Sequence, residues 1–482
     1  MILLGLLLIP LVGAALIALT PRRALIELLH VASAMAMLSV AAAVASEVWN
    51  GNVLAAAGDL LRVDGLSALM VAVIAILGMI ASLYAVGYLR AEMGDAHLSH
   101  VRLFFALFHL FIFTMLLAVT TDNLGVMWIA VEGTTLATVF LVNLRHTRAS
   151  IEAAYKYLIL SSVGIALAFI GTALMYYAGA AKAGEIAVNW SALRAGAATL
   201  NAHVVRSAFV FIIVGYGTKA GLAPMHTWLP DAHSEAPAPI SALMSGVLLN
   251  VGLYAIMRFK AVVDVAVGPA FAADLLIGVG LLSLLIAAVF LVAQRNFKRM
   301  LAYSSVEHIG IACLGLGFGG YWGMFGALFH VINHALAKSL LFILSGNILL
   351  KYHSAEIRDV RGLLRSAPMT GALFLAGILA LIGLPPFAPF ISEFIIFRAG
   401  LESHPWAAVT GVILLVVVFG GMLASINRML YGEPPADLPR GDALRFWLAP
   451  LSVNFALLLA FGLTLPAPFE AAIKQALRAL GV

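Results

Sequence analysis

Apolar residues occur in long, nearly uninterrupted runs that follow one another along the 482-residue chain. A helix needs about 20 mostly apolar residues to cross the hydrocarbon core of a bilayer. Runs of about that length lie at approximately 2–20, 24–46, 65–89, 102–120, 123–144, 154–178, 206–222, 239–263, 270–293, 300–318, 321–349, 368–400, 405–431 and 445–465. They are too long for the strands of a membrane β-barrel and do not alternate as such strands do. The pattern predicts an all-α polytopic membrane protein with about fourteen transmembrane helices.

The composition supports a membrane protein and argues against other classes. Hydrophobic residues make up 63% of the chain and charged residues only 11%, whereas a soluble domain has roughly 25% charged residues. A soluble enzyme, a disordered scaffold and a nucleic-acid binder are therefore disfavoured. The single cysteine, Cys313, allows no internal disulfide and no cysteine-ligated zinc or iron–sulfur site. No P-loop is present, so we expect a partner or an ion gradient to supply energy.

The basic residues between the predicted helices indicate an orientation. With fourteen spans, the loops on one side of the membrane contain 17 Lys and Arg residues, and those on the other side contain 9. Because cytoplasmic loops are enriched in Lys and Arg, this bias predicts that both termini lie outside the cytoplasm. Arg22 and Arg23 follow the first run, which is the wrong polarity for a signal peptide, so we expect this run to remain as a helix.

Prolines interrupt two of the predicted helices. The seventh reads GLAP at Pro224, and the twelfth reads GLPPFAP with Pro385, Pro386 and Pro389. A proline removes a helix hydrogen bond and frees carbonyl groups, which the hydrocarbon region tolerates only beside protein or water. Two such breaks five spans apart suggest an internal repeat, as is typical of secondary transporters.

Two ionisable side chains lie within predicted spans of the first half. Glu132 occupies the middle of the fifth span, GVMWIAVEGTTLATVFLV, and Lys219 lies late in the seventh, FIIVGYGTKAGLAPMHTWLP. Ionisable groups at this depth are costly to insert, so each is a functional candidate. The two residues form either a static buried ion pair that fixes helix packing or a pair whose opening and closing controls the lysine proton. The spacing alone leaves both interpretations open.

The eleventh span contains three polar residues at helical spacing. His330, His334 and Lys338 occupy positions i, i+4 and i+8 of HVINHALAKSLLFILSG, and therefore share one helix face. Because histidine titrates near neutral pH, this face predicts a hydrated proton relay. An H-x-x-x-H pair can bind zinc, but further ligands are not visible and Lys338 opposes a cation. Packing histidines remain the other alternative.

Three more polar residues belong to the same half. Glu307 and His308 are adjacent in the tenth span and point about 100° apart on a helix. We expect Glu307 to serve the Lys338 cluster. Glu393 follows the break in the twelfth span and is either a relay terminus or an interfacial cap. Single polar residues such as His109 are interpreted equally well as hydrogen-bonded packing or as relay members.

Three strings of the sequence resemble one membrane-protein family. GLAPMHTWLPDAHSEAPAPISALMSGVLL, KRMLAYSSVEHIGI and HVINHALAKSLLFILSG are similar to the antiporter-like, proton-translocating subunits of respiratory complex I, Mrp antiporters and energy-converting hydrogenases. The resemblance covers about 66–430. It implies fourteen helices with two inverted five-helix repeats and broken helices seven and twelve. The implied division is 1–101, a first half-channel at 102–263, a second at 270–431, and a last helix within 432–482.

The resemblance also implies roles for the buried residues. Glu132 and Lys219 match the glutamate and lysine of the first half-channel; His330, His334 and Lys338 match the central relay, and Glu393 matches its terminal charge. This chain has Asn250 where many complex I members have a lysine, and His233 or water is a candidate bridge. Together with Glu307–His308 and the short tail, Asn250 resembles hydrogenase-4 component F, of the group 4 nickel–iron hydrogenases.

The predicted function is therefore proton translocation within a multisubunit, redox-driven complex of a prokaryotic plasma membrane. The implied partners are other integral membrane subunits, including further antiporter-like subunits, and peripheral redox subunits that carry nickel–iron and iron–sulfur centres. No cofactor and no catalytic redox site are expected in this chain, because it has no ligand set or nucleotide fingerprint for them. The alternatives are an Mrp-type sodium/proton antiporter subunit and a channel partner or anchor of another membrane complex.

Overall fold

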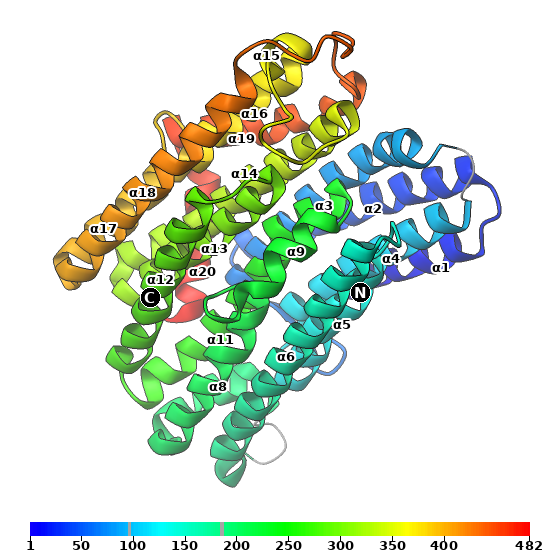
Figure 1. Ribbon diagram of the computed structural model, residues 1–482. Helices are drawn as coiled ribbons and strands as arrows, with labels where there is room; N and C mark the ends of the chain where they lie inside the picture. The colour runs from blue at the N-terminus through cyan, green and yellow to red at the C-terminus, as the bar shows by residue number, and fades with distance from the viewer. Residues whose placement is uncertain (95–97, 184–187) are drawn as a thin grey trace.

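The computed structural model describes residues 1–94, 98–183 and 188–482, which are almost entirely helical (Figure 1). The N-terminal elements are α1 (Ile2–Leu19), α2 (Arg23–Trp49), the antiparallel strands β1 (Leu54–Ala56) and β2 (Leu61–Val63), and α3 (Gly65–Met93). The next elements are α4 (Leu98–Thr120), α5 (Leu124–Val142), α6 (Arg148–Ala183), α7 (Trp190–Ala195), η2 (Ala197–Thr199), α8 (Ala202–Ala220), η3 (Met225–Thr227), α9 (Trp228–Glu235), α10 (Ala238–Leu243), the π-helical turn η4 (Met244–Leu248) and α11 (Leu249–Ala266). The remaining elements are α12 (Pro269–Val292), α13 (Phe297–Phe318), α14 (Gly320–Tyr352), α15 (Leu363–Ser366), α16 (Pro368–Leu381), α17 (Ala388–Ser403), α18 (Pro405–Leu430), η5 (Arg445–Leu448), α19 (Leu451–Leu463) and α20 (Ala467–Leu480).

The predicted all-α membrane architecture is confirmed. Within the described residues, 13 helical segments are long and apolar enough to cross a membrane, and they correspond to thirteen of the predicted runs. The remaining run, 368–400, is divided into α16 and α17, of 14 and 16 residues. Neither piece reaches the length of a full span. The difference in count therefore comes from the proline-rich break of the twelfth span, which the sequence predicts.

The first break lies between α8 and α9, and side chains satisfy the backbone groups that it frees. Gly221 ends α8 with a φ of +79°, a conformation that favours glycine. The indole N–H of Trp228 donates to the carbonyl oxygen of Thr218 at 2.9 Å, and the amide of Ala223 donates to Ser283 Oγ at 3.0 Å. A helix interrupted inside a bilayer is tolerated because the protein supplies these partners.

The second break lies between α16 and α17 and is satisfied in the same way. Gly383 has a φ of +68°, and Pro385 and Pro386 follow it. The amide of Leu384 donates to the carbonyl oxygen of Leu379 at 3.1 Å, and the side-chain amide of Asn333 donates to that of Ala388 at 3.1 Å. Asn333 belongs to α14, so the break is attached to the helix that carries the predicted histidines.

Three candidate spans form the interior of the bundle. The most apolar windows of α10–α11, α13 and α14 are fully buried within the protein, whereas only 33%, 22% and 28% of the residues in those of α2, α18 and η5–α19 are buried. Figure 1 shows the early helices on one side, α14 and α16–α18 on the other, and α8, α9 and α11 between them. α6 packs against both α5 and α8, and α14 packs against α13 and α17. Polar side chains on the interior helices therefore face protein rather than lipid.

Three basic residues that the orientation count assigns to loops are buried in the structure. Arg258 and Lys260 in α11 are each 5% exposed, and Lys298 in α13 is 1% exposed. The long aliphatic parts of these side chains allow the charged groups to reach acceptors inside the protein. The length of an apolar run in the sequence does not reveal such contacts. Lys182, also included in that count, belongs to a stretch whose side chains lie outside the described part of the structure. The orientation itself stays a prediction.

The C-terminal region contains a helix that the sequence analysis did not predict. α20 follows α19 and packs its buried face, which includes Ile473, Ala476 and Leu477, against α3. Gly65 at the start of α3 allows this approach, because a Cβ atom there would lie within 2.5 Å of the backbone of Gln475. A helix of this length and amphipathicity is too short and too polar to be found by counting apolar runs.

Candidate functional site

The ammonium group of Lys219 is fully buried and is held by two hydroxyl groups. It donates to Thr135 Oγ1 at 2.6 Å and to the hydroxyl of Tyr157 at 3.1 Å, and it lies 5.0 Å from the centre of the Tyr157 ring. The lysine is in the last turn of α8, immediately before the first break. Thr135 belongs to α5 and Tyr157 to α6, so three helices form this site. Both acceptors are neutral hydroxyl groups, and each can also donate a hydrogen bond.

The carboxylate of Glu132 lies beyond Thr135, and it does not contact Lys219 directly. It accepts hydrogen bonds from Thr135 Oγ1 at 3.1 Å and from Ser162 Oγ at 2.8 Å. Glu132 is only partly buried, and Thr135 bridges it to the lysine, so a hydroxyl group links the two residues that the sequence indicates as a pair. The reason is geometric, because Lys219 reaches α5 one turn away from Glu132.

Lys338 forms a second buried cation centre at the interface of α13 and α14. Its ammonium group is fully buried, and it donates to the carbonyl oxygen of Leu301 at 2.9 Å and closely to Ser304 Oγ. Glu307, on the same side of α13, is 5% exposed, and its charge interacts with that of Lys338. Glu307 thus lies beside the Lys338 cluster, as the sequence suggests, without a direct hydrogen bond between these two described residues.

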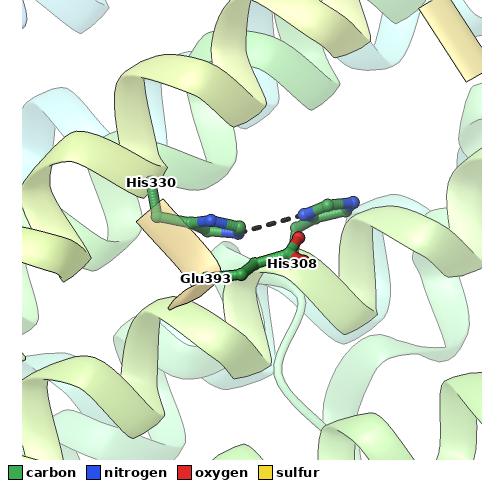
Figure 2. A group of neighbouring side chains, drawn as sticks. All are labelled: His308, His330 and Glu393. Carbon is green, nitrogen blue, oxygen red and sulfur yellow. Dashed lines mark hydrogen bonds between the residues drawn. The ribbon is translucent and has the colours of Figure 1, made fainter. Parts of the chain in front are cut away.

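The histidine cluster is assembled across helices rather than along α14. His308 Nδ1 of α13 and His330 Nε2 of α14 share a hydrogen bond of 3.0 Å, and His330 Nδ1 contacts Ser392 Oγ of α17 at 3.0 Å. Figure 2 shows the two rings with the carboxylate of Glu393 pointing toward them. The His308 and His334 rings also stack, with centres 5.5 Å apart. The helical spacing correctly predicts one buried face, but it does not show that the partner of His330 is His308.

Glu393 lies beside the second break. Its carboxylate packs over Gly383, where a Cβ atom would overlap a carboxylate oxygen. The side chain is half-buried and lies in the second turn of α17, and it does not cap that helix. Among the described residues, His308, His330 and Glu393 each offer one metal-ligating atom, and these atoms lie within 4.8 Å of one another. The structure therefore groups a different histidine pair with a carboxylate than the H-x-x-x-H spacing suggests.

Several buried polar atoms in the interior of the bundle have no hydrogen-bond partner within the described part of the chain. His233 of α9 stacks between Trp228 and Phe342, and its ring nitrogens have no hydrogen-bond partner among the described atoms. The same is true of His334 and of Asn250 Oδ1, although the Asn250 amide donates to the Gly246 carbonyl oxygen at 2.7 Å. Buried polar atoms are normally satisfied by protein or by ordered water. The region is therefore suited to a file of water between α8 and α14.

The sequence analysis missed the hydroxyl groups that organise both centres. These residues are Thr135, Tyr157, Ser162, Ser304 and Ser392. Thr135 and Ser304 carry a local signal, because each lies three residues from a candidate glutamate, Glu132 or Glu307, and so shares its helix face. The others come from neighbouring helices, whose packing is not encoded in any single span.

Other buried polar groups have well-defined partners outside these centres. His109 shares a hydrogen bond of 3.0 Å with His30 within the N-terminal helices. Arg258 binds both carboxylate oxygens of Asp64, at 2.6 and 2.7 Å. Burial alone raises the pKa of Asp64, but the charge and hydrogen bonds of Arg258 outweigh this effect and lower the pKa below its ordinary value. This closed ion pair is therefore a structural tie between α11 and the start of α3.

Comparisons with known proteins agree with this architecture. A family model described as the transmembrane region of NADH:quinone oxidoreductases and Mrp antiporters matches residues 121–419. A second, described as the N-terminus of chain 5 of NADH-ubiquinone oxidoreductase (complex I), matches residues 60–99. A hydrogenase-4 component F homolog of Methylacidiphilum infernorum (isolate V4) is 38% identical over 413 residues, covering 85% of this chain and 86% of that protein.

Solved structures share the fold over nearly the full length. A chain of the membrane-bound sulfane sulfur reductase, an archaeal respiratory membrane complex, has a TM-score of 0.89 and 25% identity, covering 99% of this chain and 97% of that chain. A chain of the Mrp complex from Dietzia sp. DQ12-45-1b has a TM-score of 0.87 and 23% identity, covering 98% and 96%. The second likeness concerns the fold alone. The resemblance inferred from the three sequence strings is confirmed.

Proposed function

We propose that this chain, which belongs to the family of antiporter-like membrane subunits shared by NADH:quinone oxidoreductases and Mrp antiporters, translocates protons within a multisubunit, redox-driven membrane complex. One observation carries the proposal: two lysines, Lys219 and Lys338, are fully buried inside an apolar helical bundle, and neither forms a direct ion pair with any residue that the structure describes. Isolated charges are costly in such a position and are typical of ion and proton pathways.

The first half of the proposed cycle uses Lys219, Thr135 and Glu132. Glu132 is partly exposed on α5, so a charge in a neighbouring subunit can act on it. Attraction of the carboxylate away from Thr135 weakens the negative field at Lys219, and the lysine then releases its proton toward the interior. Thr135 is suited to this task because it accepts from the lysine and donates to the carboxylate.

The second half uses the centre on α13, α14 and α17. The proton moves along water and His233 to Lys338, which has His334 one helical turn away on α14. His330 and His308 then carry it to Glu393 beside the second break, with Glu307 balancing the charge of Lys338. Imidazoles suit this relay because each can accept a proton at one nitrogen and donate from the other.

The required energies are compatible with such a device. Moving one charge against 100 mV costs about 2.3 kcal/mol. A change of one pKa unit corresponds to about 1.4 kcal/mol, so a shift of less than two units suffices. Opening one charge interaction in a low-dielectric site can supply this amount.

We assign the first half-channel to residues 102–263 and the second to 270–431, related as inverted repeats and flanked by 1–101 and 432–482. The broken helices at Pro224 and at Pro385–Pro386 open the two ends of the path. The chain is an integral membrane protein, and we place it in a prokaryotic plasma membrane with both termini outside. We also propose that the partner subunits carry nickel–iron and iron–sulfur centres and that this chain carries no cofactor; the name of the hydrogenase-4 relative supports a hydrogenase-type complex.

An Mrp-type sodium/proton antiporter is the second candidate, because the family model that matches residues 121–419 describes Mrp antiporters as well as NADH:quinone oxidoreductases. Mild-detergent pull-down of the tagged chain, with partner identification and metal analysis, separates the two. A nickel–iron hydrogenase module or its cofactor-free relative supports the redox-linked function. Recovery of small antiporter subunits without any redox protein, together with sodium-stimulated transport, contradicts it.

The test of the mechanism compares buried and exposed residues of the same type. We expect Glu132→Gln and Lys219→Met, in the complex reconstituted into vesicles, to reduce redox-driven acidification by roughly tenfold or more, because proton-transfer groups typically contribute at least that much. Glu152→Gln and Lys474→Met change exposed residues and serve as matched controls. Assembly is verified by size exclusion. If assembly and pumping both survive either buried change, the proposed mechanism is wrong.

A further inference from the structure

We propose that His308, His330 and Glu393 form a binding site for a divalent transition-metal ion of the zinc type, and that the bound ion closes the second half-channel. The binding site stands on its own geometry, whereas the closing effect rests on the proposed function. The ion is an inhibitory ligand that enters and leaves, rather than a resident cofactor.

The three ligands come from three different helices and already lie close together. His308 belongs to α13, His330 to α14 and Glu393 to α17, and their ligand atoms lie within 4.8 Å of one another (Figure 2). The shortest of these separations is the 3.0 Å between His308 Nδ1 and His330 Nε2. With Zn–N bonds of about 2.0–2.1 Å, two nitrogens in a tetrahedral site are about 3.3 Å apart. The rings therefore need to separate by only a few tenths of an ångström, while the carboxylate moves inward.

The outer hydrogen bond of a metal-bound histidine is already formed. His330 Nδ1 contacts Ser392 Oγ at 3.0 Å, and this hydroxyl donates to the carbonyl oxygen of Pro389 at 2.9 Å. Asn333 donates to the same hydroxyl at 3.2 Å. Metal-ligating histidines almost always bond through their other ring nitrogen to an oxygen partner, which fixes the tautomer and the ring orientation. Because Ser392 holds His330 Nδ1, the other ring nitrogen, Nε2, points toward the proposed metal site.

The donor set selects the class of metal. Two imidazoles and one carboxylate, with a fourth position open to water, are a typical zinc set. Magnesium and calcium prefer oxygen ligands and more of them, so these ions fit poorly. The Lys338 ammonium repels a cation bound nearby. This ammonium donates hydrogen bonds to the carbonyl oxygen of Leu301 and to Ser304 Oγ, and the Glu307 carboxylate offsets part of its charge. This repulsion weakens binding and makes it reversible.

The position of the site explains how an ion reaches it and what it blocks. Glu393 is half-buried beside the break between α16 and α17, whereas the two histidines are buried. An ion therefore arrives from the side of the broken helix. Once bound, it displaces the proton that His308 Nδ1 and His330 Nε2 share in their hydrogen bond, takes the lone pairs of both nitrogens, and neutralises the carboxylate. A proton then has no acceptor at this step.

The binding test uses the assembled complex after removal of loosely bound metal by a chelator. Zn²⁺ uptake is measured by competition with a chromophoric chelator, with Mg²⁺ as the control ion. Loss of an outer-shell partner costs 10–100-fold in metal affinity, so loss of a direct ligand is expected to cost at least about tenfold. We expect this loss for His308→Gln, His330→Gln and Glu393→Gln. His334→Gln is the matched control, because this buried histidine lies outside the ligand set.

Retained folding is verified by a ligand-preserving change. His330→Cys offers a thiolate in place of the imidazole, so we expect zinc uptake to persist in this variant while His330→Gln loses it. Size exclusion confirms assembly of each variant. Zinc uptake that is equal in wild type and in all three glutamine variants overturns the site, as does an equal loss in His334→Gln.

A transport measurement separates this inference from the proposed function. We expect Zn²⁺ to stop redox-driven acidification in wild type and a chelator to restore it. If the three residues bind zinc but pumping continues, both the closing effect and their relay role are overturned. If the glutamine variants stop pumping although wild type binds no zinc, the relay stands and the metal site is overturned.

Discussion

The two buried lysines are held in different ways, and in the proposed mechanism the first belongs to an input centre, which senses a neighbouring charge, and the second to a transfer centre, which passes the proton on. Lys219 donates to two side-chain hydroxyls, and one of these leads to the partly exposed carboxylate of Glu132. Lys338 donates to a backbone carbonyl and a serine, and its further neighbours are imidazoles. The first arrangement connects the lysine to the outer surface of the bundle. The second connects it to the interior and to the other broken helix.

This contrast assigns the electrostatic trigger to the first half of the chain. In the proposed mechanism, the partly exposed carboxylate of Glu132 on α5 responds to a charge in a neighbouring subunit. At the second centre, the carboxylate beside the lysine is that of Glu307, which is buried. This centre is better suited to receive a proton and pass it on than to sense a neighbour.

The largest expected effect comes from replacing either lysine with arginine. Arginine keeps the positive charge but does not release a proton in proteins. If both lysines lose their proton in each cycle, Lys219→Arg and Lys338→Arg reduce vesicle acidification by about a hundredfold or more, as expected for a lost acid–base group. Lys474→Arg, on the exposed face of α20, is the control. Normal pumping by either buried variant would show that this lysine is a fixed charge. That lysine would then have no proton-transfer role in the cycle.

A smaller effect is expected from the histidine that joins three helices. His330→Gln removes the hydrogen bond to His308 and one relay position, so we expect pumping to fall by on the order of tenfold to a hundredfold. His109→Gln is the matched control, because His109 is also buried and also bonded to a second histidine, His30. Initial rates of acidification per assembled complex are compared. Equal losses in the two variants would mean that the effect comes from packing rather than from position in the relay.

Thr135, which links Lys219 to Glu132, offers a test of the input centre with a smaller expected effect. Thr135→Val keeps the shape and removes the hydroxyl, so the carboxylate loses its contact with the lysine. We expect pumping to slow by about tenfold, because a hydrogen bond to a charged group is worth about 1.5–3 kcal/mol and about 1.4 kcal/mol corresponds to tenfold. Thr135→Ser restores the rate. Thr120→Val removes a buried hydroxyl that bonds only to the carbonyl oxygen of Leu116 in its own helix and is the control. An unaffected Thr135→Val variant removes the bridge from the mechanism.

The sequence predicts the spans and broken helices of this molecule better than the side-chain contacts between its helices. Run length determines the spans, and the prolines at 224, 385 and 386 locate both broken helices, because these signals are local. Helical spacing also places His330 and Lys338 on one buried face. It does not identify the helix that packs on that face, so the His308–His330 bond and the Ser392 contact could not be predicted.

The same reasoning explains the errors about charge. A carboxylate in the middle of an apolar run is expected to be buried and paired, yet Glu132 is on the outward side of α5 and is bridged through Thr135. A lysine at the edge of a run is expected in a loop, yet Lys298 reaches inward and donates to the carbonyl oxygens of Ser234 and Ala236. Side-chain length and neighbouring helices decide these cases, and neither is visible in hydropathy.

The smallest effect on transport is expected where a buried charge is fully paired. Asp64 and Arg258 form a closed ion pair, in contrast to the two open lysine centres. Asp64→Asn leaves a buried guanidinium without its anion, and breaking one partner of a buried pair typically costs about 3–5 kcal/mol of stability. We therefore expect a lower thermal denaturation temperature for the detergent-solubilised complex, with pumping per assembled complex unchanged.

The pH dependence of that stability has a defined sign. The folded pKa of Asp64 lies below its ordinary value of 3.8, since the effect of Arg258 exceeds that of burial. The unfolded chain consequently binds more protons than the native protein as the pH falls below about 4, and stability is lost in that range. Asp64→Asn lacks this titration, so its denaturation temperature changes less between pH 5 and pH 3 than that of wild type. If Asp64→Asn loses pumping but keeps wild-type stability, the Asp64–Arg258 ion pair takes part in transport rather than in stability. The distinction between this directly paired charge and the two lysines would then be wrong.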